Sequence, residues 1–109
     1  MPVVTCVVSG VLKTPDNQGL SGVTIRANMI SPFIYPTTTT VIMNNEVTTT
    51  TDVNGAWSLT LVETENNEST MTITIDYPSG GGNYRRKDYT VIIPDQASVD
   101  FSTLIVGQL

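Results

Sequence analysis

Apolar and polar residues alternate along most of this chain, and that pattern predicts β-strands. Within residues 56–61, Trp57, Leu59 and Leu61 are separated by small or polar residues, so one side of an extended strand is apolar. The same alternation recurs in residues 71–75. No run combines helical apolar spacing with helix caps, so we expect at most a single helical turn.

The other predicted strands cover residues 3–12, 23–27 and 89–93, with a last strand that begins at Val99 and extends to Val106. The apolar residues that define these strands are Val4, Cys6, Val8, Leu12, Val23, Ile25, Ala27, Tyr89, Val91, Ile93, Val99 and Phe101. Gly10 falls on the apolar side of the first strand, which indicates a bend or a close approach of another group to the backbone.

Turn residues separate the strands. Asp52, Asn54 and Gly55 come directly before the strand of Trp57: the two polar side chains can accept hydrogen bonds from turn amides, and Gly55 can adopt a positive φ. Trp57 is the only tryptophan and is expected to anchor the core. Residues 14–19 form a further predicted turn.

Two more connections are predicted to lie in solvent. Residues 63–69 form an acidic loop, interpreted as a hairpin end, because its spacing matches no known cation-binding loop. Residues 77–83 contain a glycine run and are predicted to form a flexible loop. No Lys-Ser/Thr pair follows the glycines, so they do not match a phosphate-binding loop.

Residues 28–51 form a long threonine-rich insertion. Pro32 and Pro36 exclude a central strand for its first part. Asn44 and Asn45 suit a two-residue hairpin turn between the threonine runs. The alternative is a flexible, solvated loop. Either way, deletion of residues 37–50 is expected to leave a folded sandwich.

Composition narrows the possible partners. The chain has 109 residues, which suits one domain over residues 1–109, and a net charge of −5, which argues against nucleic acid and anionic membranes. A single cysteine allows no intrachain disulfide. The beginning of the sequence lacks the pattern of a signal peptide, and no apolar run is long enough to span a bilayer.

Catalytic chemistry finds little support in these residues. There is no histidine, and Cys6 lies on an apolar strand side, as expected of a structural thiol. The acidic residues fall at turns and strand ends, and only Asp76, beside Tyr77, is harder to dismiss. Residues 85–87 form a basic cluster, interpreted as a solvated strand end balanced by Asp88. We therefore assign no catalytic, cofactor-binding or metal-binding residue.

About seven strands with short connections predict an all-β fold, a single Ig-like or transthyretin-like β-sandwich with a threonine-rich hairpin insertion. The stretches that carry a family resemblance are residues 8–12, 19–25, 51–59, 89–95 and 97–101. They resemble the transthyretin-like, carboxypeptidase-regulatory-like sandwich domains. Residues 8–13 are also similar to the N-terminal domain of phage side tail fibres, and small sandwiches of this kind recur as phage head decoration proteins.

The resemblance implies a non-enzymatic virion protein, made in the host cytoplasm and bound to other virion proteins. A capsid decoration or accessory protein, present as a homo-oligomer or multivalent array, is the first expectation, because the sequence stops at Leu109 without a fibre shaft. The alternatives are a tail-fibre attachment domain, a cell-surface adhesion or carbohydrate-binding module, and a regulatory domain of a partner enzyme. Neither nucleic acid nor membrane is an expected partner.

The threonine-rich segment is the expected contact element, because only Glu46 is charged between residues 37 and 51 and such an edge can pair with another chain. The basic cluster is a second candidate. Predicted partner-binding residues are Phe33, Tyr35, Thr38, Thr40, Ile42, Thr48, Thr50, Arg85 and Arg86. For the carbohydrate alternative, Phe33, Tyr35 and Tyr84 are the candidate stacking residues.

Overall fold

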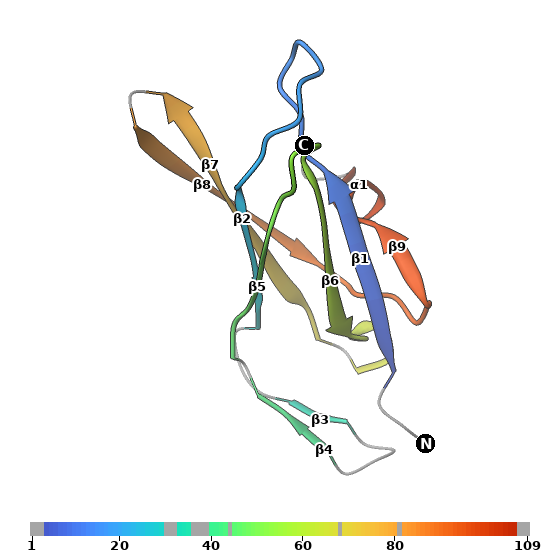
Figure 1. The fold of residues 1–109 in the computed structure, drawn as a ribbon. Coiled ribbons are helices and arrows are strands. Elements are labelled where there is room, and N and C mark those ends of the chain that lie inside the picture. Colours follow the sequence, from blue (N-terminus) through green and yellow to red (C-terminus); the bar gives the residue numbers. More distant parts are fainter. Residues whose placement is uncertain are drawn as a thin grey trace.

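The computed structural model describes residues 4–29, 33–35, 40–43, 45–67, 69–80 and 82–106 as two facing β-sheets with short helical turns (Figure 1). One sheet has the order β6 (Ala56–Val62), β1 (Thr5–Val11), β9 (Ser98–Asp100). The other has the order β5 (Val47–Thr50), β2 (Thr24–Asn28), β7 (Met71–Gly80), β8 (Asn83–Val91). The predicted all-β sandwich is confirmed.

Shorter elements complete the chain. β3 (Phe33–Tyr35) and β4 (Thr40–Ile42) form a separate two-stranded sheet, η1 (Glu65–Asn67) is a 3-10 turn, and α1 (Phe101–Leu104) is one turn of α-helix. The β7–β8 hairpin projects past the body at one end, and β3–β4 lies at the other (Figure 1). The molecule is therefore elongated, at 47 × 24 × 23 Å.

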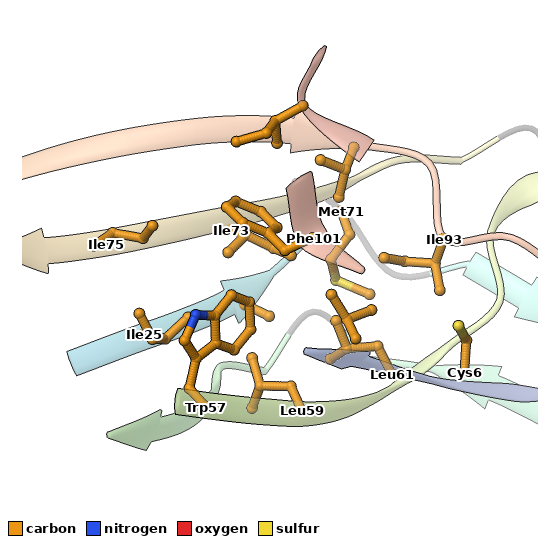
Figure 2. Close-up of a cluster of buried hydrophobic side chains, with 14 of the residues drawn as sticks. Cys6, Ile25, Trp57, Leu59, Leu61, Met71, Ile73, Ile75, Ile93 and Phe101 are labelled. Atoms are coloured by element: carbon orange, nitrogen blue, oxygen red, sulfur yellow. The ribbon is translucent and has the colours of Figure 1, made fainter. Parts of the chain in front are cut away.

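The core lies between the two sheets and follows the predicted period of two. Alternate residues of β1, β2, β6 and β7 are buried: Cys6, Val8, Ile25, Ala27, Trp57, Leu59, Leu61, Met71, Ile73 and Ile75. Trp57 packs edge-on against Phe101, with ring centroids 5.2 Å apart (Figure 2). Phe101 also packs edge-on against Tyr89, with ring centroids 5.3 Å apart. The expected role of Trp57 as core anchor is confirmed.

Gly10 lies opposite Trp57 on the neighbouring strand. A Cβ atom at this position would come within 2.9 Å of Trp57 Nε1 and 3.0 Å of two carbons of the same ring. The predicted close approach to this backbone is therefore confirmed, and the approaching group is the indole.

The turn before β6 is built as the sequence predicts. Asp52 Oδ1 accepts hydrogen bonds from the backbone N–H groups of Asn54 and Ala56, at 2.8 and 3.0 Å. Gly55 has a φ of 82°, and its carbonyl accepts from Leu12 N at 2.9 Å. The turn thus fastens the start of β6 to the end of β1.

The C-terminal strand is shorter than predicted. β9 ends at Asp100, and the chain then turns into α1. Phe101, Leu104 and Ile105 are spaced as i, i+3 and i+4, so one helical turn brings all three against the core. A strand continuing to Val106 was wrong, because it would direct Leu104 away from the core that Phe101 and Ile105 enter.

Both loops predicted to lie in solvent also differ from that prediction. β7 and β8 remain paired through Tyr77–Arg85 and Pro78–Tyr84, so most of residues 77–83 belongs to a hairpin arm. The acidic loop turns inward at its start, where Glu63 is 1% exposed and Thr64 is fully buried. Asn66 N donates to Glu63 Oε2 at 2.7 Å, and Ile93 N donates to Thr64 Oγ1 at 2.8 Å. These bonds compensate the loss of hydration.

The insertion contains a hairpin, β3–β4, but the predicted hairpin between the two threonine runs, with its turn at Asn44 and Asn45, was wrong. The strands on its two sides pair elsewhere, β4 with β3 and β5 with β2; Asn44 itself lies outside the described residues. β5 is an integral sheet strand, so deleting residues 37–50 would remove the strand that covers the edge of β2. We therefore expect this deletion to destabilise the sandwich.

Candidate functional site

The outer side of the four-stranded sheet carries a polar surface rich in threonine. Its strand register aligns Thr50, Thr24, Asp76 and Arg86 in one row, and Thr48, Arg26, Thr74 and Asp88 in the next. Thr72 and Thr90 are paired beyond them. We call these ten residues the threonine face. They point away from the core because the alternate residues, such as Ile25 and Ile73, are buried between the sheets.

The charges on the threonine face are paired with one another. Asp76 forms ion pairs with Arg26, on the neighbouring strand, and with Arg86, whose Nε lies 3.4 Å from Asp76 Oδ1. Asp88 Oδ1 accepts from Thr74 Oγ1 at 2.7 Å. Within the basic cluster, Arg86 is thus paired with Asp76 rather than with the predicted Asp88. Asp76, the carboxylate hardest to dismiss as catalytic, is held between two guanidinium groups.

The two edge strands of this sheet differ in how well they are protected against pairing with a further strand. β8 carries consecutive charges along its length: Arg85, Arg86, Lys87 and Asp88. Such charges block pairing with a further strand. β5 consists of Val47 and three threonines, with no charge and no proline. It is therefore an unprotected edge.

The backbone groups of β5 follow the antiparallel pattern. Thr51 N donates to Val23 O at 3.0 Å, and hydrogen-bonded residues alternate along an antiparallel pair. Thr49, two residues earlier, consequently bonds to β2. Thr48 and Thr50 direct their N–H and C=O groups toward the open edge. Beside it, Thr49, Ala56 and Ser58 help to line a shallow hollow of about 300 Å³ between β5 and β6.

The predicted contact residues fall in different places. Thr48, Thr50 and Arg86 come together on the threonine face, with Thr50 and Arg86 on one row at opposite edges. Arg85 is exposed on the other side of β8. Thr40 is exposed on β4, and Ile42 is half-buried and packs against the core.

The remaining predicted residues lie away from the threonine-rich edge or outside the described residues. Phe33 and Tyr35 form the ends of β3, and Thr38 lies outside the described residues. Tyr84, a candidate for sugar stacking, is 69% exposed on the hairpin arm. Together with Thr24, Asp76 and Arg86 it lines a hollow of about 510 Å³.

An apolar groove at the arm end of the sandwich was not predicted. It has a volume of about 550 Å³ and is lined by residues from β1, β6, β7, β8, β9 and α1, including Leu12, Trp57 and Tyr89. The residues come together only through the pairing of distant strands. No local sequence signal marks them as lining a groove rather than filling the core.

Cys6 is fully buried, and burial raises the pKa of its thiol. We expect 5,5′-dithiobis(2-nitrobenzoate) at neutral pH to label the native protein at least about 100-fold more slowly than the urea-unfolded chain, because the reactive thiolate is both disfavoured and inaccessible. Absorbance of the released nitrothiobenzoate measures both rates. Equal labelling of native and unfolded protein would contradict a buried Cys6.

In the described part of the chain, no three acidic or cysteine side chains gather as metal ligands would. Neither helical turn described here has the length or apolar character needed to cross a membrane. No protein-family model matches the sequence, and no curated protein matches it either.

Proposed function

We propose that the protein is a structural component of a virus particle, without catalytic activity, that attaches to other virion proteins through the β5 edge and the adjoining threonine face. The observation that carries this proposal is the contrast between the two edges of one sheet. β8 is protected by charge, whereas the edge of β5 is uncharged and unpaired among the described residues, beside a threonine-rich surface whose arginines are paired with Asp76.

Strand addition at β5 would supply affinity through main-chain hydrogen bonds, and Thr48 and Thr50 would contact the added strand through their side chains. Each contact is small, but many copies on a symmetric particle gain strength through multivalency. The virion as the site of action is supported by the resemblance of residues 8–13 to phage tail-fibre domains. A decoration or accessory role on the capsid is the form of the proposal that we favour.

The direct test compares Thr48→Pro with Thr48→Val. Proline removes a backbone N–H that points to the open edge and breaks no hydrogen bond to β2. Valine keeps the N–H and the shape of the side chain. We expect Thr48→Pro to reduce co-sedimentation with purified virus particles by about tenfold or more, and Thr48→Val to change it less than about threefold.

Both variants should melt within a few degrees of the parent protein by circular dichroism, since Thr48 is exposed. Equal binding by the proline variant would place attachment on another surface. Mass spectrometry of purified particles that finds no copy of this chain would contradict the virion role altogether.

A carbohydrate-binding module is the second candidate, and the hollow beside Tyr84 favours it. An exposed aromatic ring next to a carboxylate and two guanidinium groups offers both a stacking surface and hydrogen-bonding groups. A glycan array would then give signals that Tyr84→Ala abolishes and Thr48→Pro preserves. An array without signal above background would dismiss this alternative.

A further inference from the structure

The apolar groove continues into a second hollow at the arm end of the sandwich. The first, of about 550 Å³, and the second, of about 590 Å³, share Val11, Leu12, Ile75 and Tyr89. Because four residues line both, the two hollows adjoin and together make a groove between the end of β1 and the inner side of β7–β8. We call it the arm groove. Its size lies in the range of small-molecule binding sites.

The walls of the arm groove are mainly apolar. Trp57, Phe101 and Ile105 line its first end, and Leu20 and Tyr77 line the second. Aromatic and aliphatic side chains of this kind bury the carbon skeleton of a ligand and leave orientation to a few polar groups. The groove has such groups at both ends.

The first end is also lined by Ser9, Asp100 and Ser102, and its buried donor is the indole N–H of Trp57. It is buried and has no hydrogen-bond partner among the described residues. Figure 2 shows the nitrogen on the side of the ring away from Leu59, and a Cβ at Gly10, which also lines the groove, would lie 2.9 Å from it. Buried donors are nearly always paired, so an unpaired one beside a groove indicates an acceptor supplied from outside the fold.

At the second end, the polar groups are Lys13 and Lys87. Neither forms an ion pair with a carboxylate of the described residues, and no carboxylate is among the residues that line this end. Lys87 Nζ lies 5.6 Å from the ring centroid of Tyr89, and Lys13 Nζ donates to Asn17 Oδ1 at 2.9 Å. In a chain of net charge −5, two unpaired ammonium groups at one mouth favour an anionic group there.

We propose that the arm groove binds a small amphipathic carboxylate with a second oxygen atom at its apolar end, such as a hydroxy or keto acid. The carboxylate faces Lys13 and Lys87, the carbon chain lies against Leu12 and Tyr89, and the far oxygen accepts from the Trp57 N–H. This site is separate from the β5 edge. Thr48→Pro should leave it unchanged, so either proposal can fail without the other.

The test uses three ten-carbon probes: 10-hydroxydecanoate, decanoate and decane-1,10-diol. Isothermal titration calorimetry measures affinity, and the fluorescence of the sole tryptophan reports binding beside the indole. We expect 10-hydroxydecanoate to bind saturably and alter the fluorescence. Decanoate, which lacks the far oxygen, should bind at least threefold more weakly, and the diol, which lacks the charge, at least fivefold more weakly.

Two matched variants locate the site. Val11 lines both hollows and is 57% exposed, whereas Val53 is 79% exposed and lines neither. We expect Val11→Phe to weaken binding of 10-hydroxydecanoate at least tenfold by narrowing the groove, and Val53→Phe to change it less than twofold. Both substitutions lie at the surface, and thermal melts check that both variants fold.

A third variant separates charge from shape. Lys87→Met should weaken 10-hydroxydecanoate several-fold and leave the diol unchanged. No saturable binding of any probe overturns the proposal, and so does equal weakening by Val11→Phe and Val53→Phe. Equal affinity for the acid and the diol overturns the role of the lysines, and equal affinity for 10-hydroxydecanoate and decanoate overturns that of the indole.

Discussion

Gly55→Ala is expected to destabilise the protein by about 4 kcal/mol. Gly55 has a positive φ, which costs an alanine about 1–2 kcal/mol. The added Cβ would also lie 2.1 Å from the backbone oxygen of Leu12, so the turn would have to separate from β1. Overpacking against backbone adds about 1–3 kcal/mol, and the hydrogen bond from Leu12 N to Gly55 O would be strained.

Gly22→Ala is the matched control for this prediction. Gly22 has a φ of 74°, close to that of Gly55, but a Cβ there would meet nothing within 4 Å. Gly22→Ala should therefore lower the free energy of unfolding only by the cost of a positive φ in alanine, about 1–2 kcal/mol. Urea unfolding followed by circular dichroism measures both. Similar losses for the two variants would show that the turn is not held against β1.

Trp57→Ala is expected to cost about 3–5 kcal/mol, because it removes the largest side chain of the core and its contact with Phe101. Trp57→Phe should cost much less. Phenylalanine keeps an aromatic ring in the core, although a smaller one. It also removes a buried N–H that has no hydrogen-bond partner in the described residues.

The pair Gly10 and Trp57 allows a sharper test by double-mutant cycle. Gly10→Ala alone should cost about 1–3 kcal/mol, since its Cβ would lie 2.9 Å from Trp57 Nε1. In the Trp57→Phe background that nitrogen is absent, so the same substitution should cost at least about 1 kcal/mol less. Additive effects in urea unfolding would mean that the indole does not lie over Gly10.

Strands with one buried side could be predicted from the sequence because burial repeats every second residue. Trp57, Leu59 and Leu61 illustrate this, as does the turn whose amides Asp52 satisfies. Prediction failed where neighbours distant in sequence decide the conformation. Glu63 belongs to an acidic stretch typical of solvent, yet Asn66 and the surrounding chain bury it.

The C-terminal helix and the surfaces show the same limit. Phe101, Leu104 and Ile105 have the spacing of a helical turn, but Phe101 and Ile105 also fit the alternation of a strand. A segment as short as α1 therefore could not be assigned to helix or strand from its pattern. Thr48 and Thr50 were singled out for their lack of charge, but their position at a sheet edge depends on pairing with β2. The arm groove depends on residues from six separate strands and helices, and no local sequence pattern marks it.

The parallel pairing of β1 with β9 has a consequence for how the molecule forms. β1 occupies the middle of its sheet, between β6 and a strand from the other end of the sequence. A ribosome delivers β9 only after all the strands between it and β1 have emerged, and closing so large a loop is slow. One flank of β1 should therefore stay unpaired until β9 has emerged, while the nascent chain is prone to aggregate.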